Sequence, residues 1–401
     1  MTIKQNRIVE KAYEASLDLL HSLSTPKGFL ASNNEAANYK RIWARDGVIT
    51  GLAALRSGDK KLIRTFAKTL DTLKRAQDHT GRIPSNISLD GKNISYGMTV
   101  GRIDATIWYV IGVCQYTLAT NDGGLWRHFQ LSVQDALHYL DCLELNGRGL
   151  LYIPHGADWA DEYLNHGYVL FDQALRYIAL LSYYRLTKKA ATKRQLAKLK
   201  RLIEINFFPG DKPTTQDDTY YHVTHKLSLR ERVRPFPIPH FTNHSVHHHI
   251  DNFAIALVLQ NKLLDSKRAK TLAKAVTDKF LKKETDILPA FHPVITPKSN
   301  KWGQLKCISF FHFRNKPYEY HNGGLWPLVH GFFISALRRQ AGQRRHLANM
   351  SSKLQQDKFG FPEYYHGQTG KPGGTKGLGL SAAAYILAHQ AIIKNYPTFD
   401  L

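Results

Sequence analysis

A repeated pair of amphipathic helical segments is the feature that most constrains how this chain can fold. Apolar residues recur at helical spacing along most of the 401 residues, and clusters of Gly, Pro, Asn, Asp or Ser separate one periodic segment from the next. The segments expected to be helical are 3–23, 48–56, 60–77, 104–119, 125–146, 168–185, 190–207, 251–261, 266–281, 324–340, 343–355 and 379–394. Short turns join them into hairpins, with one helix left over at each end of the chain.

The order of these hairpins predicts a closed ring. The first and last helices have only each other left as partners, and a row of hairpins whose ends must pair closes most simply on itself. We therefore expect an all-α fold, an (α/α)6 toroid with the first helix of each hairpin inside, formed as a single domain by residues 1–401. An open helical solenoid is the alternative. In a ring the long loops between hairpins share one face, and functional residues are expected there.

The cysteines and the hydropathy pattern narrow the class of protein. Hydrophobic residues make up 43% of the chain, enough for a large core. The three cysteines, Cys114, Cys142 and Cys307, are odd in number and widely spaced, which favours core thiols over a disulfide framework or a zinc site. No apolar run reaches the roughly 18 residues of a membrane span, and residues 1–20 lack the profile of a signal peptide. We expect a cytoplasmic protein without membrane contact.

The formal net charge of +23 has to be weighed as a sign of a nucleic-acid partner. The densest basic run, residues 188–201, places its Lys and Arg side chains on the polar face of one expected helix, opposite Leu196, Leu199 and Leu202. No aromatic residues interleave with the basic ones, and no nucleic-acid-binding motif is present. A solvated helix face is therefore predicted, nucleic acid is not an expected partner, and the oligomeric state is left open.

Carboxylates and an aromatic residue gather in the loop that precedes the helix expected at 168–185. Asp158, Trp159, Asp161 and Glu162 lie within five positions. Carboxyl groups bond hydroxyls and transfer protons, and an indole face stacks on a pyranose ring, so the pattern is typical of a sugar site. An acidic turn that caps the helix is the structural alternative. Other long loops also carry polar residues, namely Arg45, Asp46, Asp104, His321, Asn322 and Glu363.

The histidine tract at residues 244–249, HSVHHH, raises the question of a metal. His244, His247 and His248 have helical spacing, but no cysteine accompanies them and no carboxylates are obviously paired with them. A loop or helix-entry tract is therefore predicted, and neither a metal nor another cofactor is expected.

Five motifs, taken in order, resemble those of a known class of enzymes. They are RIWARDG (41–47), RIDATIWYV (102–110), GYVLFDQAL (167–175), YHNGGLWP (320–327) and FPEYYHG (361–367). The chain resembles the neutral/alkaline invertases and, more loosely, the catalytic domain of the glycogen-debranching amylo-α-1,6-glucosidases, both of them (α/α)6 glycoside hydrolases. The resemblance extends from about Tyr39 to Ala388. It implies an inverting hydrolase that cleaves an α-glucosidic bond of a small carbohydrate without a cofactor.

The resemblance implies a catalytic pair of carboxyl groups, one acid and one base, with a water molecule between them. Glu363, in FPEYYHG, matches the base. The acid is less well fixed, because the debranching-type Trp-x-Asp motif ends on Asp161 whereas the invertase spacing falls on Ala160. We predict Asp161 as the acid, with a raised pKa, and place Asp158 second and Glu162 third.

The resemblance also implies substrate ligands. Arg45 and Asp46 resemble an Arg-Asp pair that grips hydroxyls of the nonreducing sugar; a buried ion pair that fixes an inner helix is the alternative. Asp104 is either a sugar ligand or, as we prefer, a helix N-cap. The remaining expected ligands are Asp158, Trp159, His321, Asn322, Trp326 and Tyr364, with Gly323 and Gly324 letting the backbone approach the ligand.

The substrate stays open between sucrose, which the closer invertase match favours, and an α-1,6-linked glucose stub, which Trp-x-Asp favours. Residues 162–163, Glu-Tyr, stand where the invertases have two arginines, and residues 378–380, Leu-Gly-Leu, replace a Gln-Thr-Trp segment. Because polar groups of the invertase pattern are missing, a small or oligomeric α-glucoside is preferred. The rival class is a non-catalytic (α/α)6 protein that binds carbohydrate or a polyanion, since binding requires no opposed pair of carboxyl groups.

Overall fold

The computed structural model of the protein describes residues 2–35, 38–97, 100–210, 219–282, 286–309, 312–338 and 342–399. Within these ranges lie the twelve predicted helices, most with ends close to those expected. They are α1 (Ile3–Ser22), α2 (Ala44–Ser57), α3 (Lys60–Arg75), α4 (Ile103–Thr120), α5 (Gly123–Cys142), α6 (Leu170–Thr187), α7 (Ala190–Phe207), α9 (Asn252–Gln260), α10 (Ser266–Phe280), α12 (Pro327–Ala336), α13 (Gln343–Gln356) and α14 (Gly379–Ile393). Two more helices, α8 (His222–Glu231) and α11 (Trp302–Cys307), lie in long loops and were not predicted.

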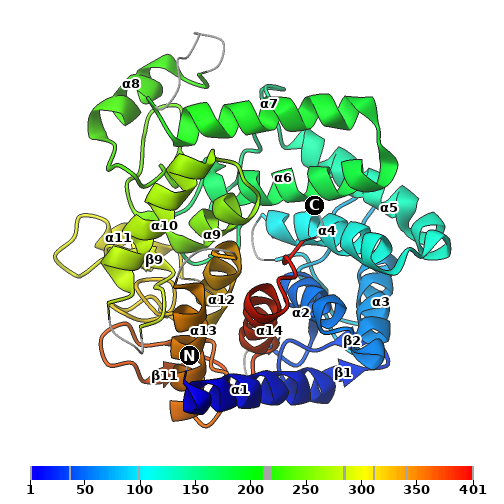
Figure 1. Cartoon of the computed structure of the whole chain (residues 1–401). Coiled ribbons are helices and arrows are strands. Elements are labelled where there is room, and N and C mark those ends of the chain that lie inside the picture. The colour runs from blue at the N-terminus through cyan, green and yellow to red at the C-terminus, as the bar shows by residue number, and fades with distance from the viewer. Residues whose placement is uncertain are drawn as a thin grey trace.

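Six of these helices form a closed inner ring. Around it α2 contacts α4, α4 contacts α6, α6 contacts α9, α9 contacts α12, α12 contacts α14, and α14 contacts α2 again. Helices α3, α5, α7, α10 and α13 each lie outside the inner helix that precedes them, and α1 lies outside α14 (Figure 1). The (α/α)6 toroid predicted from the hairpin pattern is thereby confirmed.

The distribution of apolar residues explains which helix of each pair lies inside. In α14 every residue from Gly379 to Ile392 is buried, because this helix is apolar on all its faces. In α3 the buried residues follow one stripe that includes Leu62, Phe66 and Leu70, and the opposite face carries lysines and arginines. An inner helix can therefore contact neighbours on every side, whereas an outer helix covers the ring with one face only.

Close approach of neighbouring helices depends on glycine at two contacts. A Cβ atom at Gly51 in α2 would lie 2.0 Å from the ring of Phe66 in α3, and one at Gly331 in α12 would lie 2.5 Å from the carbonyl oxygen of Ala384 in α14. Both distances are much shorter than van der Waals contact, so a larger residue at either position would push the helices apart.

The two ends of the chain pair with each other, as predicted. The hydroxyl of Tyr385 in α14 donates to the carbonyl oxygen of Val9 in α1 at 2.9 Å, and the side-chain amide of Gln390 donates to the hydroxyl of Tyr13 at 2.7 Å. The Tyr13 ring also stacks on His389, with 4.2 Å between the ring centroids. These contacts complete the sixth hairpin from segments 376 positions apart in the sequence.

Short antiparallel ladders join the long loops that lead into the inner helices. Three strands end where an inner helix begins, namely β3 (Ile42–Trp43) before α2, β6 (Tyr168–Val169) before α6 and β8 (Ile250–Asp251) before α9. The ladders are β3 with β4 (Asn86–Ile87) and β5 (Ile94–Ser95), β6 with β7 (His240–Phe241), β8 with β9 (Phe291–His292), β10 (Tyr364–Tyr365) with β11 (Pro372–Gly373), and β1 (Ser24–Thr25) with β2 (Gly28–Phe29). At the entrances of α2, α6 and α9, ladder hydrogen bonds therefore fix the backbone that carries the side chains.

Two inner helices differ from the expected bounds. Helix α2 begins at residue 44 rather than 48, so Arg45 and Asp46 lie in its first turn instead of in the preceding loop. Helix α12 begins at Pro327, a residue favoured at the first helical position because its missing N–H would have no partner there. Ala341, expected in the turn after this helix, lies outside the described residues.

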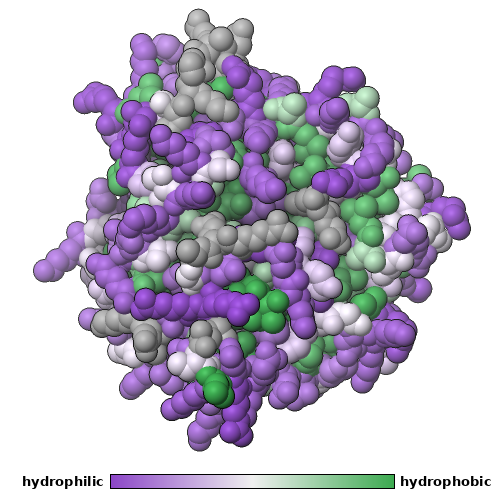
Figure 2. All heavy atoms as spheres, viewed as in Figure 1, coloured by the Kyte–Doolittle hydropathy of each residue, from purple (hydrophilic) through white to green (hydrophobic). Residues whose placement is uncertain are grey.

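The surface is largely hydrophilic on the face seen in Figure 2. On the basic helix α7, Lys193 and Arg194 are exposed whereas Leu196, Leu199 and Leu202 are buried, which agrees with a solvated polar face. Within the described ranges, no helix has the combination of length and apolar character that crossing a membrane requires.

The three cysteines are all free thiols, but only one of them is in the core. Cys114 is buried, as expected, whereas Cys142 and Cys307 are exposed. The prediction of core thiols was wrong for these two, because each is the last residue of its helix and faces solvent there.

Candidate active site

A cavity of about 310 Å³ opens among the loops that lead into the inner helices. Its volume lies at the lower end of the range typical of small-molecule sites. Seven of the predicted site residues line it: Arg45, Asp46, Trp159, Asp161, His321, Trp326 and Glu363. The other four, Asp104, Asp158, Asn322 and Tyr364, do not line it. Four separate segments of the chain thus bring these side chains to one place.

Asp161, the predicted general acid, lies against Arg102, whose guanidinium donates to Asp161 Oδ2. Burial raises the pKa of the Asp161 carboxyl, but the opposite charge of Arg102 and, to a smaller extent, that of Arg314 outweigh burial and leave this pKa below its usual value. This is the opposite of the expected shift. In the free cavity Asp161 is therefore a carboxylate.

Glu363, the predicted base, is buried and stands on a different loop from Asp161. The Tyr39 hydroxyl donates to Glu363 Oε1 at 2.5 Å, and the backbone N–H of Thr375 donates to Oε2 at 3.1 Å. Burial raises the pKa of Glu363 above its usual value, although these two hydrogen bonds and the charge of Arg314 act against the rise. A carboxylate with a raised pKa is better suited to removing a proton from water.

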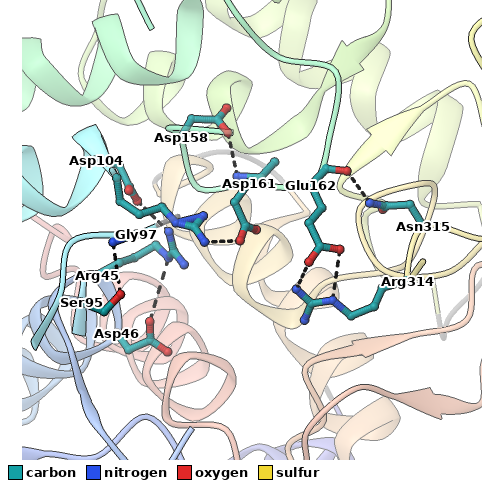
Figure 3. Close-up of polar contacts among 12 residues, drawn as sticks. Arg45, Asp46, Ser95, Gly97, Asp104, Asp158, Asp161, Glu162, Arg314 and Asn315 are labelled. Atoms are coloured by element: carbon teal, nitrogen blue, oxygen red, sulfur yellow. Dashed lines mark hydrogen bonds and ion pairs between the residues drawn. The ribbon is translucent and has the colours of Figure 1, made fainter. Parts of the chain in front are cut away.

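Arg45 pairs more closely with a residue of the neighbouring inner helix than with the residue beside it. Its Nη1 donates to Asp104 Oδ2 at 2.8 Å, whereas its Nε is 4.0 Å from Asp46 Oδ2 (Figure 3). Asp104 lies in the first turn of α4 without capping it, so our preference for an N-cap was wrong. The Arg45 and Asp46 side chains both line the cavity, and burial raises the pKa of Asp46 to about 6.

Asp158, the second candidate for the acid, shapes the loop that carries Asp161. Its Oδ1 accepts from the backbone N–H of Ala160 and its Oδ2 from the side-chain amide of Asn165, both at 2.9 Å. Burial raises the pKa of Asp158 to about 7, but neither carboxyl oxygen faces the cavity. Asp158 is thus placed to hold the turn and not to contact a ligand directly.

Aromatic side chains form one wall of the cavity. The Trp159 ring meets Trp326 edge-on with 5.5 Å between centroids, and His321 stacks on Trp326 at 5.3 Å. Trp326 Nε1 donates to the carbonyl oxygen of Tyr320, whereas Trp159 Nε1 is buried without a partner among the described residues. Burial lowers the pKa of His321 to about 3, so the imidazole is neutral at physiological pH.

Asn322, expected in the polar rim, holds the chain together instead. Its side-chain amide donates to the carbonyl oxygens of Ile295 and Asn315 at 2.8 and 3.0 Å, and its Oδ1 accepts from the N–H of Ile295 at 2.7 Å. Tyr364 stacks on Trp326 with 6.2 Å between centroids and stands outside the cavity lining. Both residues support the wall and do not form its surface.

Gly323 and Gly324, expected to let the backbone approach a ligand, are required by packing of the chain itself. A Cβ atom at Gly323 would lie 2.5 Å from Val294, and one at Gly324 would lie 2.2 Å from the carbonyl oxygen of Tyr320. Gly323 also has a positive φ of 86°, which favours glycine. Neither glycine lines the cavity.

A second guanidinium in the cavity wall was missed by sequence reasoning. Arg314 donates to Glu162 through Nη2 at 2.6 Å and Nε at 3.2 Å, a bidentate pair that Figure 3 shows next to Asp161. Arg314 lies in the loop before α12, and no sequence motif indicated that it would line the cavity. Arg102 and Tyr39 also line the cavity and were not predicted, although Arg102 begins the RIDATIWYV motif and Tyr39 begins the region of resemblance.

The histidine tract packs against other histidines outside the cavity. His240 stacks on His247 with 3.9 Å between centroids, and the His249 ring contacts Asn165 Oδ1 at 3.1 Å. Burial lowers the pKa of His240 and of His249 well below the usual value, so these rings are neutral. No group of three or more His, Cys, Asp or Glu side chains in the described ranges is arranged to hold a metal ion.

The inner ring and the outer helices give the chain the (α/α)6 fold found in several solved glycosidases. A solved structure described as "Glycosidase Wild Type" matches 97% of this chain and 98% of its own, with 16% sequence identity and a TM-score of 0.67. A mannosylglycerate hydrolase from Thermus thermophilus in complex with glucose matches 94% of this chain and 99% of its own, with 13% identity and a TM-score of 0.63.

Comparison of sequences identifies the family within that class. The family model described as alkaline and neutral invertase matches residues 11–208 and 262–395, so the chain belongs to this family of glycoside hydrolases. The probable alkaline/neutral invertase D of Arabidopsis thaliana is 23% identical over 424 residues, covering 91% of this chain and 78% of the relative. The resemblance expected from the five motifs is confirmed.

Proposed function

We propose that the chain is an inverting glycoside hydrolase that cleaves an α-glucosidic bond of sucrose, of a small α-glucoside or of an α-1,6-linked oligoglucan. Residues 1–401 would act as one catalytic domain, in the cytoplasm and without a cofactor. The observation that carries the proposal is the placement of two carboxyl groups, the buried Glu363 and the half-buried Asp161, from different loops in the wall of one cavity. Membership in a family of glycoside hydrolases supports it.

The proposed reaction is a single displacement at the anomeric carbon. Glu363 takes a proton from water as the water oxygen bonds to that carbon, while Asp161 gives a proton to the glycosidic oxygen as the carbon–oxygen bond breaks. The water attacks from the face opposite the leaving group, so an α-glucoside yields a β-anomer. Both groups are largely shielded from solvent, which favours this chemistry because it excludes other water from the reacting atoms.

An acid role for Asp161 requires its pKa to rise when substrate enters the cavity. In the free cavity Arg102 holds Asp161 as a carboxylate. A sugar that displaces water from the cavity strengthens the effect of burial, and any weakening of the contact with Arg102 acts in the same direction. The proton that Asp161 delivers would therefore be acquired as substrate binds.

The remaining polar groups would hold the nonreducing sugar. Arg45 and Asp46 line the cavity at the entrance of α2 and would bond its hydroxyls, while Trp159 and Trp326 offer apolar ring surface. We assign supporting roles to the predicted ligands outside the lining: Asp104 holds Arg45, Asp158 holds the loop of Asp161, Asn322 holds the loop before α12, and Tyr364 packs behind Trp326.

The direct test is to incubate the protein with sucrose, isomaltose, panose and a limit dextrin and to follow the released anomer by NMR. Release of the β-anomer, lost in Glu363→Gln and Asp161→Asn, supports the proposal. No release from any substrate, or unchanged activity in both variants, would refute it. Salt-dependent binding of a polyanion without hydrolysis would instead favour the rival class, a binding protein on the same ring.

A further inference from the structure

The ion pair between Glu162 and Arg314 lies in the cavity wall directly beside the proposed acid. Glu162 follows Asp161 in the chain, and its two carboxyl oxygens accept from Arg314 at 2.6 and 3.2 Å. The Arg314 side chain is 37% exposed, against 15% for Arg45 and 16% for Asp161, whereas the Glu162 side chain is 9% exposed. The guanidinium of Arg314 is therefore nearer to solvent, at the mouth side of the cavity, than Arg45 or the proposed acid, and Glu162 is largely enclosed.

Three further contacts fix the orientation of this pair. The Arg314 guanidinium lies over the Tyr320 ring, 4.2 Å from its centroid. The side-chain amide of Asn315 donates to the carbonyl oxygen of Glu162 at 2.6 Å, and Asn315 Oδ1 in turn accepts from the N–H of Asn322 at 3.1 Å. A guanidinium held from several sides loses little conformational freedom when a ligand binds it.

The Arg314 guanidinium is partly exposed, and not all of its N–H groups have a partner in the part of the chain that the structure describes. An arginine has five N–H donors, and Glu162 takes one from Nε and one from Nη2. The other three have no partner among the described residues, and Arg314 lines the cavity together with Glu162. These donors are available for ligand hydroxyls, which are also the groups that a carboxylate such as Glu162 accepts from.

The position next to Asp161 tells which part of a substrate would meet this pair. An acid protonates the leaving oxygen, so side chains next to it on the mouth side of the cavity face the leaving group and not the sugar being attacked. The carboxylate follows Asp161 in the chain, and the guanidinium comes from a loop 152 positions away.

We propose that the Glu162–Arg314 pair recognises the hydroxyl groups of the leaving group and makes the enzyme selective for glycosides whose leaving group is a second sugar. The inference rests on the proposed function. Guanidinium and carboxylate together donate to and accept from neighbouring hydroxyls, a combination that fits a sugar ring and offers nothing to a leaving group without hydroxyls. The pair selects the substrate by its leaving group, and proton transfer is the role of Asp161.

A substrate without a sugar leaving group separates recognition from chemistry. α-D-Glucosyl fluoride carries the same glucosyl unit as sucrose, isomaltose and panose, but its leaving group is a fluoride ion. We expect Arg314→Gln and Glu162→Gln to lower kcat/KM for the best of the three sugar substrates by about 10- to 100-fold, the loss typical of hydrogen bonds to charged groups, and to leave kcat/KM for the fluoride nearly unchanged. Arg314→Lys keeps the positive charge but loses the planar guanidinium, so its kcat/KM for the sugar substrate should lie between those of Arg314→Gln and the unsubstituted protein.

Arg82 offers a matched control for Arg314. It pairs with Asp78 at 3.0 Å, lies over the Tyr96 ring at 4.4 Å and has a side chain 30% exposed, but it does not line the cavity. Arg82→Gln should leave the ratio of the two kcat/KM values as it is. Because Arg314 also bears on the pKa of both proposed catalytic carboxyls, each variant is compared at its own pH optimum.

Several outcomes would overturn the inference. Equal losses on sugar substrate and fluoride in Arg314→Gln would mean that the pair merely clamps two loops, and no loss on either would mean that it takes no part. Cleavage of the fluoride alone by the unsubstituted protein would show that a sugar leaving group is not accepted. If the unsubstituted protein cleaves none of these four substrates and no limit dextrin either, the proposed function fails and the inference fails with it.

Discussion

Asp161 and Glu363 line the same cavity. They differ in the charge of the side chain that each of them contacts. Asp161 contacts the guanidinium of Arg102, whereas Glu363 accepts from the neutral hydroxyl of Tyr39 at 2.5 Å. Burial raises the pKa of each carboxyl, but the charge of Arg102 reverses the shift for Asp161, and the pKa of Glu363 stays raised. The charge of the nearest side chain therefore decides the direction of the pKa shift more than burial does.

This difference bears on the proposed mechanism, because the acid has to be protonated before the bond breaks. In the free cavity the carboxyl with the raised pKa is the proposed base, and the one with the lowered pKa is the proposed acid. Either substrate changes the pKa of Asp161, as proposed above, or the two residues exchange roles. Substitutions of the two carboxyls and of their neighbours separate these alternatives.

The largest effect is expected from Glu363→Gln. Water has to lose a proton whichever leaving group departs, so this variant should lose about 10²- to 10⁴-fold in kcat on the best sugar substrate and on α-D-glucosyl fluoride alike. Initial rates with both substrates measure the loss. Glu14→Gln, which changes an exposed glutamate of α1, serves as the control and should behave like the unsubstituted protein. Full activity of Glu363→Gln on either substrate would contradict the assignment of the base.

Asp161→Asn should show a loss that depends on the leaving group. We expect about 10²-fold or more on sugar substrates, whose leaving oxygen needs a proton, and a much smaller loss on the fluoride, which departs as an anion. The ratio of the two rates, compared with that of Glu363→Gln, is the decisive measurement. The reverse pattern, with Glu363→Gln sparing the fluoride and Asp161→Asn losing both substrates, would mean that the roles are exchanged.

Arg102→Gln tests the cause of the difference in pKa. Burial raises the pKa of Asp161 and Arg102 lowers it, so removal of the guanidinium should raise it. A general acid is active while protonated, and the alkaline limb of kcat/KM against pH should therefore move to higher pH. Arg82→Gln should leave that limb in place. An unmoved limb in Arg102→Gln would mean that Asp161 does not titrate in the free enzyme, and a move to lower pH would contradict the electrostatic argument.

The fold was largely predictable because it depends on local periodicity. The helix at 379–394 was expected from its apolar residues, and the unpaired helices at the two ends of the chain predicted closure of the ring. Asp161 and Glu363 could be named because each stands in a motif. Their partners could not, since Tyr39 reaches Glu363 across 324 positions and Arg314 reaches Glu162 across 152, and no periodicity links such segments.

Polar residues inside motifs were the main source of error in the candidate site. Asn322 and Asp104 stand in segments typical of the family, and either could have faced a ligand or the chain. Asn322 bonds the backbone of Ile295 and Asn315, and Asp104 bonds Arg45. Whether such a side chain faces a ligand or bonds the chain itself depends on which neighbouring groups lack a partner once the ring has closed. The spacing of residues in the sequence does not show which groups these are.

Asp172 shows what burial does to a carboxyl that has no cation beside it. It lies in the first turn of α6, is fully buried, and has no partner for either carboxyl oxygen among the described residues. Burial and then the charges of Asp158, Asp104 and Asp251 raise the pKa of Asp172 well above its usual value. A folded-state pKa above the unfolded one contributes stability that is full below the unfolded pKa, about 4, and is lost as the pH rises through the folded pKa.

The smallest effect in this series is therefore expected from Asp172→Asn, and it concerns stability alone. Because asparagine has no charge to bury, Tm should fall less in the variant than in the unsubstituted protein as the pH is raised from about 5 to about 9. Each kcal/mol recovered at the upper pH should appear as a rise in Tm of about 1 °C in a chain of 401 residues. Thermal unfolding followed by circular dichroism at several pH values measures both curves. Parallel curves would mean that ionisation of Asp172 costs no stability. Burial in the absence of a neighbouring arginine would then not explain why the pKa of Glu363 is raised while that of Asp161 is lowered.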